Sequence, residues 1–100
     1  MKYRFHPDAI AEYEGAARYY ADRKAALELR FIECVESAVR SVADAPTRWA
    51  LFEDDVRRCL VHVFPYAVLY TIEADYILIL AIMHCSREPG YWRGRIESAR

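Results

Sequence analysis

Four side chains that could take part in recognition or catalysis follow the most apolar segment of the chain. His84, Arg87, Tyr91 and Trp92 lie within the nine residues that come after the apolar run Tyr76 to Met83. Arginine binds phosphates, carboxylates and aromatic faces, tyrosine and tryptophan fill protein pockets, and histidine can exchange a proton near neutral pH. The segment therefore predicts either a site that acts on a phosphate or an anchor for another protein.

The same residues also have purely structural interpretations. His84 could cap the preceding strand by bonding to backbone, and we favour this interpretation because the sequence shows no carboxylate partner for it. Tyr91 and Trp92 could fold back onto a sheet as part of its core, or they could stay exposed as an aromatic anchor. The sequence leaves the choice for these two aromatic residues open.

Metal and cofactor chemistry is not indicated. Cys34, Cys59 and Cys85 are far apart and form no CxxC pair, which argues against a zinc site and against a disulfide framework. We interpret them as small buried side chains in a reducing compartment. There is no glycine-rich phosphate loop and no Ser-His-Asp pattern. We therefore expect neither a metal nor a cofactor.

Length and charge exclude several classes of protein. With 100 residues, 55% of them hydrophobic, the chain is expected to form one domain over residues 1–100. Its net charge of −1 argues against a general nucleic-acid binder. Residues 1–55 carry 8 basic and 11 acidic side chains, whereas residues 56–100 carry 6 basic side chains, all arginine, and 4 acidic ones. The N-terminus has the pattern of a strand and not of a signal peptide, and no apolar run is long enough to span a bilayer, so we expect a soluble, cytoplasmic protein.

The first half of the chain predicts a strand and two helices. Residues 2–6 alternate as a strand, and helices follow at about residues 7–21 and 24–44. Pro7 suits the first turn of the first helix, and we place Asp22 as the cap of the second. The predicted buried stripes are Ile10, Tyr13, Ala16, Ala17 and Tyr20 on the first helix, and Leu27, Phe31, Val35, Ala38, Val39 and Val42 on the second.

The second half predicts an antiparallel sheet. Strands are expected at residues 56–64, 67–73 and 76–85, after a connecting segment that could include some strand. The last strand is apolar on both faces, and such a strand must be covered on both sides. Two helices cover only one face of a sheet, so the C-terminal tail or another chain is expected to cover the other. The expected faces of the last strand are Ile77, Ile79, Ala81 and Met83 on one side, and Leu78, Leu80 and Ile82 on the other.

Short motifs occur along the chain in an order typical of a known superfamily. They are Phe5-His6-Pro7-Asp8-Ala9, Ala16-Ala17-Arg18-Tyr19-Tyr20, Arg30-Phe31 with Val35-Glu36, Pro46, Val56-Arg57-Arg58, Phe64-Pro65-Tyr66 with Tyr70, Ile79-Leu80-Ala81-Ile82, His84, Arg87-Glu88-Pro89, Trp92 and Arg95. Over essentially its whole length the chain resembles the RelE/ParE superfamily of toxins from type II toxin–antitoxin systems. It is most similar to the ParE-like, plasmid-stabilisation branch.

The resemblance implies a fold, a partner and a set of binding residues. The implied fold is α+β, with element order β-α-α-β-β-β, a two-helix hairpin on one face of a mainly antiparallel sheet, and the first strand beside the last. The implied partner is a cognate antitoxin that holds the toxin inactive in a hetero-oligomer. Residues expected to bind the antitoxin or the cellular target are Arg57, Arg58, Leu78, Leu80, Arg87, Tyr91, Trp92, Arg93 and Arg95.

The superfamily includes two activities, and departures from one pattern favour the other. RelE-like members cleave mRNA on the ribosome with a set of cationic side chains and no metal. Here Ala67 stands where their strand arginine is expected, and residues 53–55 are acidic where lysines are expected. Acidic groups would repel an RNA phosphate, so the resemblance favours ParE-like inhibition of DNA gyrase, with no catalytic residue. The alternatives are an endoribonuclease that uses His84, Arg87 and Tyr91, and a degenerate toxin that only binds its antitoxin.

Overall fold

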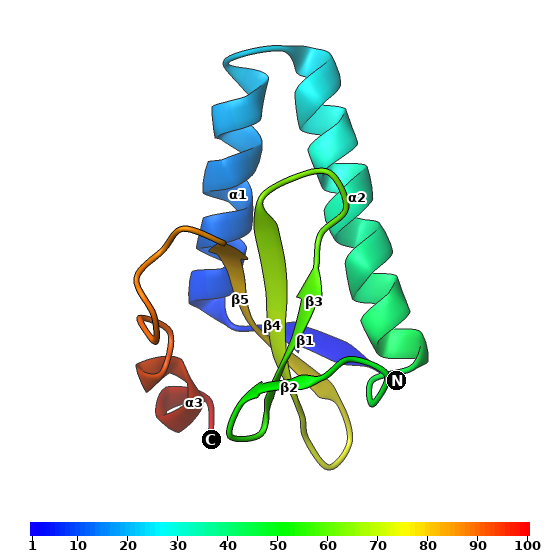
Figure 1. Cartoon of the computed structure of the whole chain (residues 1–100), viewed down its shortest axis with the longest axis vertical. Coiled ribbons are helices and arrows are strands. Elements are labelled where there is room, and N and C mark those ends of the chain that lie inside the picture. The colour runs from blue at the N-terminus through cyan, green and yellow to red at the C-terminus, as the bar shows by residue number, and fades with distance from the viewer.

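The computed structural model describes all 100 residues and has the expected α+β architecture. Its elements, in order, are β1 (Tyr3–Phe5), α1 (Pro7–Ala21), α2 (Ala25–Asp44), β2 (Leu51–Glu53), β3 (Val56–Leu60), β4 (Tyr66–Ile72), β5 (Ile77–His84) and α3 (Gly94–Ala99). The long helices α1 and α2 form an antiparallel hairpin that packs on one face of a five-stranded sheet (Figure 1).

The bounds of α1 are those predicted from the sequence, residues 7–21. Its first turn is capped by His6, whose Nδ1 accepts a hydrogen bond from the backbone N–H of Asp8 at 3.0 Å. The predicted burial of Ile10 is wrong, because this side chain is 44% exposed. The buried stripe runs through Ala9 instead, and neighbouring residues of a helix point about 100° apart.

Two expectations about the start of α2 are also wrong. Lys24 is the N-cap of α2, whereas Asp22 ends α1, with its backbone N–H bonded to the carbonyl of Arg18 at 3.0 Å. Leu27 is 37% exposed and not part of the core. Figure 1 shows the physical reason: the helical hairpin extends beyond the strands at its loop end, so the first turn of α2 has no sheet beside it.

The strand order is β1-β5-β4-β3-β2, which confirms that the first strand lies beside the last. β1 is parallel to β5, and the other neighbours are antiparallel. β2 is an additional short strand in the predicted connecting segment, and it turns into β3 at Asp54, whose φ of 49° aspartate tolerates. The two edge strands have three residues each, so each leaves a short open border.

A β-bulge changes which side chains of β5 face the helices. β5 pairs with β4 on either side of Leu80, which has no partner residue of its own. One extra residue reverses the alternation of all residues after it. Ala81 and Met83 consequently lie in the core away from the helices, contrary to the prediction, and Ile82 lies in the helix-side core.

β3 is shorter than predicted, and its end redirects the chain. The strand stops at Leu60, and the following loop passes through Val63, a β-branched residue with a φ of 73°. Phe64, expected to be the last residue of this strand, instead enters the helix-side core, where its ring centroid lies 5.2 Å from that of Phe31. The turn leaves Leu60 and Val63 exposed.

The C-terminal tail, residues 86–100, covers the face of the sheet that the helical hairpin leaves bare. It runs from the end of β5 back to α3 (Figure 1). Trp92 is 1% exposed and packs in a core with Leu69, Leu80 and Met83. The chain itself therefore supplies the second layer that the apolar last strand requires, and the tail, not another chain, covers this face.

Candidate functional site

Two arginines of the tail bind carboxylates of the sheet. Arg93 donates two hydrogen bonds to Glu53 of β2, at 2.5 and 2.6 Å. Arg100 donates to Glu73, at the end of β4, at 2.9 Å and to Asp55, in the β2–β3 turn, at 2.7 Å. The hydrogen bonds from these arginines hold the pKa of Glu53 and the pKa of Glu73 below the usual glutamate value. The guanidinium of Arg93, predicted to bind a partner, is therefore already paired within the chain.

A glutamate of α1 joins the tail to the edge of β5. Glu12 accepts hydrogen bonds from Arg95 at 2.8 and 2.9 Å, from the Tyr91 hydroxyl at 2.6 Å and from the backbone N–H of Ile82 at 3.1 Å. Arg95 also donates to the carbonyl of Leu80 at 3.1 Å. β1 ends before this part of β5. There the side chains of Glu12 and Arg95 bind the backbone groups of Ile82 and Leu80 to which a neighbouring strand would otherwise bond.

Sequence reasoning missed this role of Glu12. Its bonding partners are 70 to 83 residues away in the sequence. No local spacing marks such a contact. The one available signal was the excess of arginine in the second half of the chain, which lacks enough acidic residues of its own to pair with them.

The three residues of the nuclease alternative line one groove. His84, Arg87 and Tyr91 border a cavity of about 260 Å³ between α1 and the tail. This cavity shares Tyr66 and His84 with an adjoining one of about 380 Å³, so we call the two together the Tyr66 groove. The groove brings together residues that are distant along the chain, since Glu12 and Tyr19 of α1 also line it.

The side chains of the Tyr66 groove are engaged with one another. The Tyr91 hydroxyl donates a hydrogen bond to Glu12, and burial together with this hydrogen bond raises the pKa of Tyr91. The guanidinium of Arg87 lies 3.9 Å from the centroid of the Tyr91 ring. His84 accepts a hydrogen bond at Nδ1 from the backbone N–H of Ser86 at 3.1 Å, which confirms its predicted capping role. A phosphate entering this groove would meet the carboxylate of Glu12.

The remaining predicted binding residues differ in how accessible they are. Leu78 and Leu80 are buried beneath the tail, so a partner does not reach them in this conformation, and Trp92 is the tail residue that packs in the same core. Arg57 is half-buried and donates to the carbonyl of Trp49 at 2.6 Å, which holds the segment before β2 in place. Their roles in binding stay predictions.

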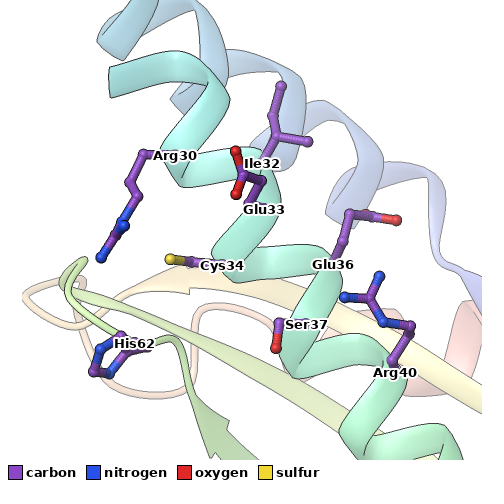
Figure 2. A pocket seen from close by; sticks show the side chains of 8 residues that line it. All are labelled: Arg30, Ile32, Glu33, Cys34, Glu36, Ser37, Arg40 and His62. Carbon is purple, nitrogen blue, oxygen red and sulfur yellow. The ribbon is translucent and has the colours of Figure 1, made fainter. Parts of the chain in front are cut away.

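A wide depression of about 630 Å³ lies along the outer side of α2. Figure 2 shows Arg30, Cys34 and His62 on one side of it, whereas Ile32 and Glu36 point away on the other side of the helix. Side chains that diverge in this way do not form a common binding site. No three or more His, Cys, Asp or Glu side chains of the protein are grouped so that they could hold a metal ion.

Exposed apolar side chains lie on the edge strand β2, at the end of β3 and in the loop that follows β3. Leu51, Phe52, Leu60 and Val63 are all exposed, although they are large and hydrophobic. β2 has no strand on its outer side. An open strand edge flanked by exposed apolar side chains can pair with an extended segment of another protein.

These observations define a class of protein before they define a family. None of the helices is both long enough and apolar enough to cross a membrane. The fold is a two-helix hairpin on a five-stranded sheet, and its open surfaces are an edge strand and an aromatic groove. This is a small α+β protein whose surface suits binding to other proteins.

Comparison with known proteins identifies the family. The chain matches the family described as "ParE toxin of type II toxin-antitoxin system, parDE" over residues 3–89, and it belongs to that family. The fold is similar to a solved structure described as "Chromosomal ParDE TA system from P. aeruginosa", with a TM-score of 0.74, 16% sequence identity and coverage of 84% of this chain and 95% of that chain. No curated protein matches the sequence. The predicted resemblance to ParE-like toxins is confirmed.

Proposed function

We propose that this chain is the growth-inhibiting toxin of a type II toxin–antitoxin pair and that it acts by binding DNA gyrase, without chemistry of its own. In this proposal residues 1–100 form one toxin domain, which works in the cytoplasm and is neutralised there by a cognate antitoxin in a hetero-oligomer. Membership of the ParE toxin family supports the toxin assignment. The gyrase target is our inference from the ParE-like pattern of the sequence.

The observation that carries the binding mechanism is the bonding of Tyr91 in the Tyr66 groove. A tyrosine whose hydroxyl donates a hydrogen bond to Glu12, with 2.6 Å between the two oxygens, and whose pKa is raised is poorly suited to exchange protons with a ribose or a phosphate. RNA cleavage also needs several cations close to the scissile phosphate. Ala67, at the position of the expected arginine, is fully buried and cannot supply one.

An antitoxin partner is supported by the open border at β2. The tail already covers the far face of the sheet, so a partner has to bind at an edge or on the outer surface. The exposed side chains of Leu51 and Phe52 lie on the edge strand itself. A segment of the antitoxin that adds a strand there would satisfy the free backbone groups and cover this apolar surface.

The test is controlled production of the full chain in bacterial cells, with and without the protein encoded by the neighbouring reading frame. We expect growth arrest that the neighbouring protein relieves. With purified protein, we expect inhibition of gyrase supercoiling and accumulation of gyrase-cleaved DNA. Growth arrest combined with normal supercoiling at a large excess of the toxin would refute the gyrase mechanism.

A ribosome-dependent mRNA endoribonuclease is the second candidate, because His84, Arg87 and Tyr91 do line one groove. For that mechanism, Arg87→Ala and Tyr91→Phe would each abolish mRNA cleavage and leave antitoxin affinity nearly unchanged. We expect instead that the unaltered protein does not cleave ribosome-bound mRNA. A degenerate toxin would affect neither gyrase nor mRNA and would not slow growth when produced alone.

A further inference from the structure

A small cavity on the tail side of the sheet has the composition of a carboxylate-binding pocket. It has a volume of about 180 Å³ and lies between the β2–β3 hairpin and the loop that precedes α3. Phe52, Met83 and Trp92 supply its apolar surface, and Arg58 and Arg87 supply positive charge. We call it the Trp92 pocket. It adjoins the open edge of the sheet, because Phe52 belongs to β2.

Neither arginine of the Trp92 pocket is paired with a carboxylate. The guanidinium of Arg58 lies 4.6 Å from the centroid of the Phe52 ring, and that of Arg87 lies 3.9 Å from the centroid of the Tyr91 ring. Stacking of this kind orients a guanidinium and leaves its N–H groups free to bind an anion. By contrast, the three arginines nearer the C-terminus each bind at least one carboxylate.

The pocket's own carboxylate does not neutralise these two charges. Glu53 lines the pocket, but both of its oxygens accept hydrogen bonds from Arg93, at 2.5 and 2.6 Å. A bidentate pair of this geometry satisfies the glutamate. The net charge that Arg58 and Arg87 bring to the pocket is therefore available to an anion from outside the chain.

Trp92 contributes a polar group without a partner. Its indole Nε1–H is buried and donates to no acceptor within the protein. Buried donors are almost always bonded, so an unpaired one needs an explanation. The Trp92 ring lies against Phe52, with a centroid separation of 6.3 Å, at the wall of the pocket. An acceptor oxygen inserted beside the ring would supply the missing partner.

We propose that the Trp92 pocket binds the carboxylate of an aspartate or glutamate side chain of a partner protein. The proposal rests on the proposed function to the extent that this partner is the antitoxin. The carboxylate lies between Arg58 and Arg87, and an apolar neighbour in the partner packs on Phe52 and the exposed Leu60. In an extended segment paired with β2, every second side chain points toward this face of the sheet. One of these side chains can therefore be the aspartate or glutamate that enters the pocket.

A protein ligand is favoured over a nucleic acid by the surroundings of the pocket. Its apolar surface suits a side chain and not a sugar–phosphate backbone. Asp54, next in the chain to the pocket residue Glu53, has no ion-pair partner and would repel the neighbouring phosphates of a polyanion. A single carboxylate meets less of that repulsion, because it carries one charge and enters between two arginines.

The test uses the full-length protein and two blocked peptides, acetyl-Leu-Glu-Leu-amide and acetyl-Leu-Gln-Leu-amide. Binding is followed through the indole N–H signal of Trp92 in ¹⁵N NMR spectra. The protein has two tryptophans, so Trp49→Phe, which leaves the pocket intact, assigns this signal. We expect a saturable shift with the glutamate peptide and binding about tenfold weaker with the glutamine peptide, because hydrogen bonds to charged groups are stronger than neutral ones.

Variants of the two arginines provide the second measurement. Arg58→Gln and Arg87→Gln should each weaken binding of the glutamate peptide about fivefold. Arg18→Gln is the matched control, because Arg18 is exposed on α1 and does not line the pocket. Equal binding of the two peptides, unchanged binding by both pocket variants, or no shift up to the solubility limit of the peptides would overturn the proposal. Tighter binding of oligouridylate than of the glutamate peptide would overturn it in favour of a nucleic-acid site.

This outcome is separable from the test of the proposed function. Peptide binding without growth arrest or gyrase inhibition would leave the Trp92 pocket established and the proposed growth-inhibiting action on gyrase refuted. Gyrase inhibition without peptide binding would refute the pocket alone.

Discussion

Replacing Glu12 with alanine should loosen the tail and destabilise the protein by about 3 kcal/mol. The carboxylate accepts four hydrogen bonds, two of them from the guanidinium of Arg95. Hydrogen bonds that share one group are not additive, so the ion pair sets the scale. Breaking a buried ion pair costs about 3–5 kcal/mol. Because the side chains of Arg95 and Glu12 keep 13% and 17% of their exposure, we take the lower end of that range.

Urea unfolding followed by tryptophan fluorescence measures this loss. With an m-value of about 1.5 kcal/mol per molar urea, a loss of about 3 kcal/mol lowers the unfolding midpoint by about 2 M. Glu12→Gln keeps an acceptor for part of the network and should lose about half as much. Glu14→Ala is the matched control on the same helix, because Glu14 is exposed, and it should change stability by less than about 0.5 kcal/mol.

The change should appear first in the tail. Without Glu12, Tyr91 and Arg95 lose their link to α1, and the backbone N–H of Ile82 loses its acceptor. Hydrogen exchange should therefore accelerate in α3 and at Ile82 more than in α2. The reasoning is refuted if Glu12→Ala unfolds at the same urea concentration as Glu14→Ala, or if exchange in α3 is unchanged.

Three further perturbations test other parts of the structure. Val63→Gly should raise the free energy of unfolding by about 0.5–1 kcal/mol in urea experiments, because glycine adopts the φ of 73° without strain, whereas Val63→Ala keeps the strain and should show no gain. Because the pKa of Tyr91 is raised in the folded protein, the unfolded chain loses the tyrosine proton first, so stability should fall as pH rises above about 10. Tyr91→Phe should make this fall shallower, and an equally steep fall would contradict the raised pKa of Tyr91. The lowered pKa of Glu73, caused mainly by its hydrogen bond from Arg100, contributes stability that is complete above about pH 4.5 and is lost as pH falls through the folded-state value. Arg100→Gln should remove this part of the acid sensitivity, as measured by hydrogen exchange in α3, and an unchanged acid profile would count against the pairing.

Features that depend on neighbouring residues could be predicted from the sequence. The bounds of α1 follow from Pro7 and from a three- and four-residue apolar period, and both act within the helix itself. The turn at residues 54–55 and the antiparallel strands after it follow from alternation and polar turn residues. Asp54 and Asp55 interrupt the apolar alternation whatever distant segments pack beside them, so this signal is local.

Features that depend on distant contacts could not be predicted in the same way. The burial of Leu27 depends on how far the sheet reaches along α2, and α2 is longer than any strand. The faces of Ala81 and Met83 depend on the bulge at Leu80, which the apolar run of β5 does not mark because every residue in it suits either side. Periodicity gives no information where both faces are apolar.

The candidate site shows the same division. The sequence identified Arg58, Arg87, Tyr91 and Trp92 as residues with the chemistry for binding, because that depends on residue type alone. It did not identify Glu12, whose contacts close the edge of β5, nor did it separate the arginines that are paired in the chain from those that are free. Pairing is a property of distances between elements, and these distances exist only in the folded protein.

The amino-acid sequence by itself determined the helical hairpin, the antiparallel strands, the need for cover on both faces of the last strand, and the toxin family. Each of these follows from periodicity, turn residues or the order of short motifs along the chain. Only the tertiary structure decided that the tail is that cover, that Trp92 is core and not an exposed anchor, and that Arg58 and Arg87 keep their charge free beside it. The physical reason is that burial and ion pairing depend on which distant segments meet, and an apolar tail satisfies the same sequence pattern whether it covers its own sheet or lies open to a partner.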